Sequence, residues 1–398
     1  MIPLYLNAPQ KQFIRPEKTP LFWGKEADLL PYQDPPPQDY SFWMKQTGAI
    51  AGPLIGILVS KSKNSIFLGS RAFYEQIQAG LQEADGGLAF LFSLQDIKPE
   101  TIEGLCYCKN KGVWLQAVFP YPNIVYNRIS SRTEESSEPF HRFASLLKQR
   151  KIAFFNPHFL DKYEMYEKFR DNPDIKGHLP ETILIREQED FTEFLSRHKD
   201  LYLKPVNKSQ GSGILRIILK ADGRCQYCSP HSCKDLPSIQ ALWKEVEKIS
   251  NNNLYIAQVT IPPELSLDRK YDYRVHAHFS RGAYEITGIG VRMARPGGIT
   301  THTSKGGEIV PLAFHIKKHA EQKIPALIQA CGKALTKEYG FFGEFTADIG
   351  TAPDGSLYLF ELNAKPMPFD EVEIEERKIR KLIALFYTLT NDGEMEGS

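Results

Sequence analysis

Apolar and polar positions alternate in two recognisable ways in the first half of the chain. Residues 54–59 form an uninterrupted apolar run, which is typical of a parallel strand covered on both faces. Apolar residues then recur at helical spacing, at Phe73, Ile77 and Leu81, before a second apolar run over residues 88–92. This order of strand, helix and strand predicts an α/β domain.

A different pattern begins near residue 158. Asp161 and Glu164 have the spacing of a helix N-terminal capping box, which places Lys162 in the first helical turn. Beyond them the pattern predicts a strand over residues 201–204, a helix over 237–249, strands over 254–259, 273–279, 284–293 and 308–312, a helix over 324–335, a hairpin over 343–363 and a C-terminal helix from about residue 370.

We therefore expect an α/β and α+β multidomain protein. The first 50 residues contain Pro35, Pro36 and Pro37 in succession, which cannot join the interior of a sheet. The predicted parts are an extended or β N-terminal appendage (1–50), an N-terminal α/β domain (51–157), a small subdomain with a glycine-rich hairpin (158–250), a C-terminal subdomain with an acidic hairpin (251–390) and a frayed tail (391–398).

Composition narrows the class of protein. The chain has 398 residues, with 49 Lys and Arg against 48 Asp and Glu, so its formal charge of +1 gives no field that attracts nucleic acid. No run approaches the roughly 20 apolar residues of a membrane helix, and the first residues lack the pattern of a signal peptide. We expect a cytoplasmic protein with no membrane span, whose six cysteines stay thiols.

Two carboxylates face each other in the predicted C-terminal hairpin. If Asp354 and Gly355 form a two-residue turn, Asp348 lies directly opposite Glu361. Like charges placed opposite each other repel, which favours a cation between them, and Asn363 projects from the same face as Glu361. These oxygen ligands suit Mg²⁺ or Mn²⁺ completed by water and phosphates; a solvated hairpin face is the alternative.

Two predicted strands are connected by a glycine-rich segment, which comprises Ser209, Gln210, Gly211, Ser212 and Gly213. A Rossmann turn or a Walker loop would open a helix instead, so both of those nucleotide folds are disfavoured. A glycine-rich hairpin can fold over phosphates, with its backbone N–H groups as donors. Because Lys204 lies on the strand before it, the segment favours nucleotide binding, and an ordinary turn is the alternative.

Arginines on the next predicted strands suit the recognition of an anion. Asp272 and Arg274 share one strand face, and Arg292 falls on a neighbouring strand. The planar guanidinium of arginine fits phosphate or carboxylate; a surface Asp–Arg pair is the alternative. His302 lies in a polar loop that ends in two glycines, where a histidine is more often an ordinary loop residue than a base.

Four soft metal ligands fall within nine residues, at Cys225, Cys228, His231 and Cys233. Their spacings are tighter than in most structural zinc sites, and a second ligand pair downstream is missing. We therefore favour reduced thiols in a hairpin extension, with a zinc site as the alternative.

A series of motifs runs through residues 53–375. Its members are Lys162, Lys204 before the glycine-rich segment, Gln258 at a strand end, Asp272 with Arg274, Arg292, Gly306 with Gly307, Asp348, and Glu361 with Asn363. In this order they resemble the ATP-grasp superfamily. More narrowly, residues 53–57, 125–129, 155–157, 161–166, 179–182 and 361–366 resemble its YheC/YheD spore-coat-associated branch.

The resemblance implies an ATP-grasp fold with an N-terminal α/β (pre-ATP-grasp) domain and ATP between the small and C-terminal subdomains. The implied roles are phosphate binding for Lys162, Lys204 and the glycine-rich segment, adenine binding for Gln258, Mg²⁺ (or Mn²⁺) binding for Asp348, Glu361 and Asn363, and contact with the transferred phosphate or the acyl substrate for Arg274 and Arg292.

The chemistry implied by the resemblance is attack of a carboxylate on the γ-phosphate of ATP, followed by displacement of the acyl phosphate by an amine. The implied partners are a small-molecule or peptide carboxylate, an amine and, beyond these, spore-coat proteins. The implied location includes the spore or its coat. Two alternatives stay open, which are a coat protein that binds ATP without turnover and a kinase that phosphorylates a small molecule.

Overall fold

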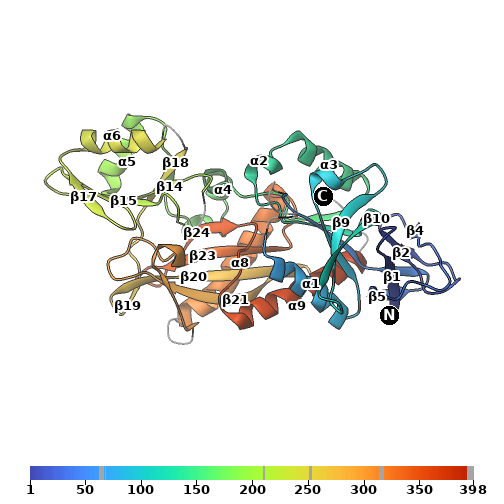
Figure 1. Ribbon diagram of the computed structural model, residues 1–398. Helices are drawn as coiled ribbons and strands as arrows, with labels where there is room; N and C mark the ends of the chain where they lie inside the picture. The colour runs from blue at the N-terminus through green and yellow to red at the C-terminus, as the bar shows by residue number, and fades with distance from the viewer. Residues whose placement is uncertain (62–66, 68, 209–210, 251–252, 313–317, 392–398) are drawn as a thin grey trace. The chain divides into compact units, whose positions relative to one another are not determined.

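The computed structural model describes residues 1–61, 67, 69–208, 211–250, 253–312 and 318–391 (Figure 1). Contacts group them into two compact units. The first unit contains residues 1–159, 339–344 and those from Glu375 onward, and the second contains 160–338 and 345–374. The second unit therefore interrupts the first along the sequence. The boundaries expected near residues 50 and 250 stay predictions.

The first unit begins with a six-stranded sheet of order β2-β1-β5-β6-β3-β4, in which β3 and β6 are parallel and the other neighbours antiparallel. Its buried Phe13 and Phe42 share one hydrophobic core with Phe90 and Phe119 of the next sheet. Residues 1–52 thus contribute to a packed core, which their proline-rich pattern did not indicate. The strands are β1 (Ile2–Asn7), β2 (Gln12–Ile14), β3 (Phe22–Trp23), β4 (Asp28–Leu29), β5 (Ser41–Thr47) and β6 (Ile50–Gly52).

A second sheet carries the α/β pattern predicted from residue 54 onward. Its order is β10-β9-β8-β7-β11-β12, with β8, β7, β11 and β12 parallel and β9 and β10 antiparallel to their neighbours. The predicted helix is confirmed, since Phe73, Ile77 and Leu81 lie on the buried face of α1. The elements are β7 (Leu54–Leu58), α1 (Arg71–Glu83), β8 (Leu88–Phe92), β9 (Ile102–Cys108), β10 (Val113–Phe119), β11 (Ile124–Asn127), α2 (Arg132–Glu135), α3 (Glu138–Gln149) and β12 (Ala153–Phe155).

The last helix, α9 (Val372–Asn391), belongs to the first unit from Glu375 onward. A Cβ atom at Gly80 of α1 would lie only 2.3 Å from Ile383 Cδ1, so glycine allows the two helices to approach closely. The Tyr387 hydroxyl donates a 2.7 Å hydrogen bond to the Gly86 carbonyl. The helix therefore does not group with the C-terminal subdomain that the sequence pattern predicts.

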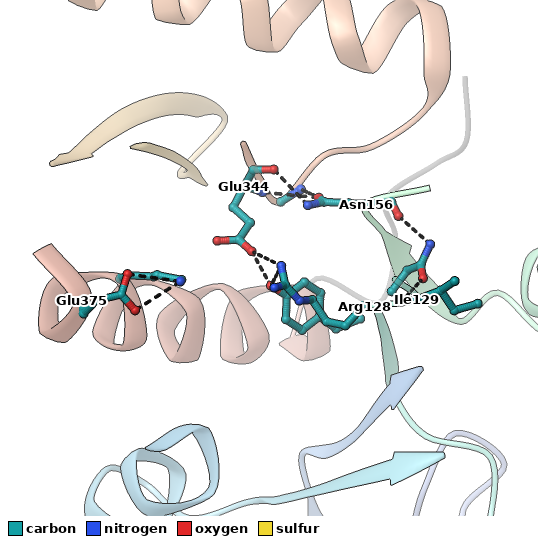
Figure 2. Close-up of polar contacts among 9 residues, drawn as sticks. Arg128, Ile129, Asn156, Glu344 and Glu375 are labelled. Atoms are coloured by element: carbon teal, nitrogen blue, oxygen red, sulfur yellow. Dashed lines mark hydrogen bonds and ion pairs between the residues drawn. The ribbon is translucent and has the colours of Figure 1, made fainter. Parts of the chain in front are cut away.

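A buried polar cluster fixes a short segment of the first unit (Figure 2). The Asn156 amide donates a 3.0 Å hydrogen bond to the Glu344 backbone carbonyl, and its side-chain oxygen accepts one of 3.0 Å from the Gly343 amide. The buried Glu344 carboxylate accepts a hydrogen bond from the Tyr126 hydroxyl and lies 3.7 Å from Arg128 Nη1. Because buried charges are tolerated only when they are paired, these contacts define the backbone that enters β23.

The second unit contains an antiparallel sheet of order β13-β18-β14-β15-β16-β17. Phe191 of α5 and Leu242 of α6 pack in one core with Leu203 and Ile217 of the sheet. The glycine-rich segment connects adjacent antiparallel strands β14 and β15, as predicted. The elements are β13 (Thr182–Leu184), α5 (Gln188–His198), β14 (Asp200–Pro205), β15 (Leu215–Leu219), β16 (Cys225–Cys228), β17 (Cys233–Leu236), α6 (Ile239–Ser250) and β18 (Tyr255–Val259).

The other sheet of the second unit has the order β22-β21-β20-β23-β24, with β19 beside β20. Helix α4 begins at Asp161, whose carboxylate accepts hydrogen bonds from the Tyr163 and Glu164 amides, so the placement of Lys162 in the first turn is confirmed. Within the described ranges, no helix is long and apolar enough to cross a membrane. The elements are α4 (Lys162–Phe169), β19 (Leu265–Ser266), β20 (Arg269–Ser280), β21 (Ala283–Met293), β22 (Glu308–Val310), α8 (Lys318–Tyr339), β23 (Glu344–Thr351) and β24 (Leu357–Asn363).

Cys228 and Cys233 form a disulfide, which corrects the expectation that all cysteines stay thiols. The two residues lie directly opposite each other on β16 and β17, with Cα atoms 4.0 Å apart. Cys225 remains a buried free thiol. Because two of the four proposed ligands, which included His231, are bonded to each other, the zinc alternative is not supported. Spacing alone did not reveal the pair, since it does not fix the register of a hairpin.

Candidate functional site

A pocket within the second unit is lined by side chains from both of its sheets. Its charged and polar lining includes Lys204, Arg216 and Gln258 from the sheet that contains β14, β15 and β18, Lys270, Asp272, Arg292, Asp348 and Glu361 from the sheet that contains β20, β21, β23 and β24, and His302 from a connecting loop. Its apolar lining includes Ile214, Val259, Ile261 and Phe360. An apolar pocket with a few convergent charged groups is the usual form of a small-molecule site.

The acidic hairpin pairs Asp348 with Glu361, so the predicted pairing is confirmed. The predicted two-residue turn is wrong. The connection spans residues 352–356, where the Gly355 amide donates a 2.9 Å hydrogen bond to the Ala352 carbonyl. Gly355 has a φ of +78°, a conformation that favours glycine and closes the longer loop.

Two irregularities in this hairpin cancel each other. Next to the loop, Thr351 pairs with Leu357, which is one step away from the register of a two-residue turn. Between Asp348 and Ile349 the register shifts back, with Phe360 as the extra residue on β24. A β-bulge of this kind re-aims the side chains beside it. The carboxylates therefore face each other because of the bulge, and Phe360 is turned into the pocket lining.

The two paired carboxylates differ in their partners. Glu361 Oε1 lies 3.0 Å from Lys162 Nζ, whereas the buried Asp348 Oδ1 has no hydrogen-bond partner among the described residues. A buried carboxylate oxygen without a partner is costly, and a divalent cation would satisfy it. The oxygen donors fit Mg²⁺ or Mn²⁺. Asn363 lies opposite Thr346, two positions beyond Glu361, and is not among the described residues that line the pocket.

Lys204 projects from β14 toward the end of β18. Its Nζ atom donates a 2.6 Å hydrogen bond to Gln258 Oε1, and the Gln258 amide donates one of 3.1 Å to the Thr182 hydroxyl. Burial lowers the pKa of Lys204 to about 8, against the opposing field of Glu361. The structure thus brings Lys204 and Gln258 together, with an ammonium that is still largely charged at neutral pH.

Glycine is required at two positions of the segment between β14 and β15. Gly211 and Gly213 have φ values of +67° and +77°. A Cβ atom at Gly211 would lie 2.7 Å from His302 Cδ2, and one at Gly213 would lie 2.9 Å from the Tyr255 hydroxyl. The backbone of this segment therefore runs close to the loop that carries His302.

The N-terminus of α4 lies beside the same segment. Lys162 Nζ donates a 2.6 Å hydrogen bond to the carbonyl of Lys208, the residue before the segment, and it also contacts the acidic hairpin through Glu361. Ser212 is exposed. Ser209 and Gln210 lie outside the described residues.

Asp272 and Arg292 are directly opposite each other on β20 and β21, and both line the pocket. The Thr301 hydroxyl donates a hydrogen bond to the Asp272 carboxylate. Burial and the nearby charge of Asp348 raise the pKa of Asp272 to about 6. This corner of the pocket therefore holds a carboxylate that is largely ionised at neutral pH and takes up a proton as the pH falls through about 6.

Arg274 lies two residues beyond Asp272 on the same strand. Its guanidinium is buried, with Cζ 5.4 Å from the centre of the Phe369 ring, and its Nε atom has no hydrogen-bond partner among the described residues. Burial lowers the pKa of Arg274. Unlike Arg292, Arg274 is not among the described residues that line the pocket. Its unused donor suits an anion.

Lys270, Tyr202 and Arg216 are among the polar residues of the pocket that sequence reasoning missed. Lys270 donates a 2.8 Å hydrogen bond to the Tyr202 hydroxyl and another to the Ile299 carbonyl. Burial lowers the pKa of Lys270 to about 7. A signal was present, because Lys270 and Tyr202 each precede a predicted site residue, Asp272 or Lys204, by two positions. Alternate residues of a strand share one face.

Two curated proteins of similar sequence carry the same description. The endospore coat-associated protein YheD of Bacillus subtilis (strain 168) is 29% identical over 334 residues, which cover 79% of this chain and 73% of the relative. YheC of the same organism, also named an endospore coat-associated protein, is 23% identical over 304 residues, which cover 70% of this chain and 81% of the relative.

A solved structure and a family model agree on the fold. D-alanyl-alanine synthetase A from Vibrio cholerae superposes with a TM-score of 0.52 at 13% identity, covering 85% of this chain and 98% of that one, which shows the fold alone. The mixed helices and sheets are thus an α/β ATP-grasp fold. The model of the YheC/D like ATP-grasp family matches residues 151–388, more than half of the chain. The chain therefore belongs to the YheC/D-like ATP-grasp family.

Proposed function

We propose that the chain is an ATP- and Mg²⁺-dependent carboxylate–amine ligase that is linked to the bacterial spore coat. A carboxylate oxygen of the first substrate attacks the γ-phosphorus of ATP, and the bond from that phosphorus to ADP breaks. An amine nitrogen then attacks the acyl carbon, the bond from that carbon to phosphate breaks, and the nitrogen loses a proton. The products are an amide, ADP and phosphate.

One observation carries the proposal: Asp348, Glu361 and Lys204 line a single pocket, and Lys162 is ion-paired with Glu361. A triphosphate needs both a metal and fixed positive groups, which this set of residues supplies. Bound Mg²⁺ would be held by Asp348 and Glu361, with Asn363 as the third proposed ligand, and would offset the negative charge of the phosphates.

Other residues around the pocket suit the phosphates and the base of a nucleotide. Lys204 is proposed to exchange its hydrogen bond with Gln258 for phosphate oxygens. Backbone N–H groups near Gly211 would add neutral donors to the same phosphates. Ile214 and Phe360 offer apolar surface for a base. Catalysis then rests on positioning and charge stabilisation, and no side-chain nucleophile is required.

The carboxylate of the acyl substrate is proposed to bind Arg292 and Arg274. Arg292 lines the pocket opposite Asp272, and the buried Arg274 keeps an unused Nε donor on the same strand as Asp272. Guanidinium groups bind carboxylate and phosphate through parallel hydrogen bonds. Both groups of the reaction, the substrate carboxylate and the transferred phosphate, are anions that this pair suits.

A second candidate is a coat protein that binds ATP without turnover. The names of the two curated relatives, both endospore coat-associated proteins, favour it. This candidate needs the same nucleotide pocket as the ligase. Nucleotide binding alone therefore does not distinguish the ligase from the coat protein. The test must measure ATP turnover.

The test measures ADP release from the full chain with ATP, Mg²⁺ and pooled carboxylates and amines. A ligase releases ADP only when a carboxylate is present and forms an amide only when an amine is present as well. Tight ATP binding without release would contradict the ligase and support the coat protein. A stable phosphorylated product that forms without an amine would identify a kinase.

Two matched variants test whether the ADP release comes from this pocket. Glu361→Gln keeps the size of the side chain but removes the proposed metal ligand, and it is expected to lower ADP release at least about 100-fold. Glu247→Gln on the exposed face of α6, a helix that contributes no described residue to the pocket lining, makes the same chemical change and should leave release unchanged. Release that survives Glu361→Gln would show that the activity comes from another site.

A further inference from the structure

The backbone of His302 is held in place from both sides. The Lys305 and Gly307 amides donate hydrogen bonds of 2.9 and 3.0 Å to its carbonyl, and its own amide donates one of 3.3 Å to the Thr300 hydroxyl. A Cβ atom at Gly307 would lie 1.9 Å from the Thr301 carbonyl oxygen, so the turn closes only with glycine there. The loop therefore presents His302 in a defined direction.

The His302 ring lies between the two features that the proposed function assigns to phosphate and metal. On one side its Cδ2 atom comes within 2.7 Å of where a Cβ atom of Gly211 would be. On the other side it shares the pocket lining with Asp348 and Glu361, whose charges act on it. Mg²⁺ held by Asp348 and Glu361 would offset the negative charge of the terminal phosphates. The ring thus borders the place of the terminal phosphate.

The His302 side chain is partly exposed, and no hydrogen bond joins its ring nitrogens to any residue that the structure describes. An imidazole carries at least one N–H donor in either protonation state. A donor on a partly covered ring in the pocket lining is available to a ligand that enters the pocket. Arg292, Arg274 and Lys204 already supply charge nearby, so the particular contribution of His302 is a directed donor.

We propose that His302 donates a hydrogen bond to the terminal phosphate of a bound nucleoside triphosphate. This inference rests on the proposed nucleotide site and adds a ligand contact that distinguishes a triphosphate from a diphosphate. The loop that carries His302 is also tied to the pocket through Thr301, which donates to Asp272. The donor is therefore positioned before the ligand arrives.

The experiment measures dissociation constants of ADP and of a non-hydrolysable β,γ-imido ATP analogue, both with Mg²⁺, by calorimetry on the full chain. His302→Ala is expected to weaken binding of the triphosphate analogue about tenfold or more while changing ADP affinity less than about twofold. His302→Asn, which restores an N–H donor, is expected to recover most of the loss. Unchanged ADP binding by the same variants shows that the pocket is folded.

His141→Ala, on the exposed face of α3, is the matched control and should change neither constant. Equal weakening of both ligands by His302→Ala would overturn the inference, because it would show that the ring only packs against Gly211. Unchanged affinity for the triphosphate would overturn it as well. A parent chain that binds neither nucleotide would contradict the proposed function itself, whereas a chain that binds both without ligase turnover leaves the His302 contact standing.

Discussion

Lys204 donates its 2.6 Å hydrogen bond to the neutral carbonyl oxygen of Gln258, not to a carboxylate. A buried ammonium with a neutral partner loses solvation without gaining an ion pair, which explains why burial lowers the pKa of Lys204 to about 8. The charge of this lysine is therefore available to a polyanion below that pH.

Nucleotide affinity should depend on pH through Lys204. Phosphate binds the charged ammonium, so affinity should be constant below about pH 8 and fall as the pH rises through that value, approaching about tenfold per pH unit. Dissociation constants of ADP with Mg²⁺ between about pH 6.5 and 9.5 measure this. Gln258→Glu adds a carboxylate partner and should move the fall to higher pH. If affinity instead begins to fall near pH 7 and Gln258→Glu does not change that pH, the group responsible is Lys270, whose pKa is lowered to about 7.

Asp348→Asn should have opposite effects on stability and on metal binding. Removing one of two facing charges relieves repulsion with Glu361, so the metal-free protein should gain about 0.2–1 kcal/mol in free energy of unfolding. The same change removes a metal ligand, so Mg²⁺ with ADP should raise the melting temperature less than it does in the parent. Thermal scans with and without ligand check both effects. Lower stability in the metal-free state would show that the pair is compensated within the protein.

Two glycines in the connections on either side of β15 provide a matched test of backbone crowding. Gly211 and Gly223 both have positive φ values, +67° and +84°, but only Gly211 lies against another residue, His302. Both alanine variants should lose about 1–2 kcal/mol of stability. Gly211→Ala alone should also weaken nucleotide binding, because its Cβ atom displaces the loop. Equal affinities of the two variants would show that the segment does not approach the phosphates.

The disulfide predicts a thiol count. The chain has six cysteines, of which four are free, so titration of the denatured, unreduced protein should find four thiols and the reduced protein six. Cys233→Ser should cost roughly 2 kcal/mol of stability, a modest amount because Cys228 and Cys233 are only five residues apart. Six thiols without reductant would mean that the pair is reduced in the isolated protein.

The facing carboxylates were predictable from the sequence, but the path of the chain between them was not. The spacing of Asp348 and Glu361 was interpreted through a two-residue turn, whereas the structure reaches the same pairing through a longer loop and a bulge at Phe360. Spacing counts residues and does not show where an extra one is accommodated. The position of Lys162 was easier to predict, because the start of its helix is set by local hydrogen bonds to the Asp161 side chain.

Most of the features that the sequence did not predict depend on contacts between residues far apart in the chain or on strand register. Four of the six strands in residues 1–52 contain only two or three residues, which is too few to show an alternating pattern. Their order is set by contacts between Phe13, Phe42 and the neighbouring sheet, which no local pattern encodes. The pairing of Cys228 with Cys233 likewise depends on register. Lys270 and Tyr202 were encoded locally, and strand alternation applied to the known motifs would have found them.

The place of α9 in the first unit has a consequence for synthesis. Ile379, Ile383 and Phe386 of this helix are buried, and the helix packs against Gly80 of α1. On the ribosome, residues 1–159 emerge long before these side chains do, so the N-terminal unit waits with an uncovered apolar face while the interrupting unit is made. The core of the N-terminal unit therefore cannot be completed until the interrupting unit has been synthesised.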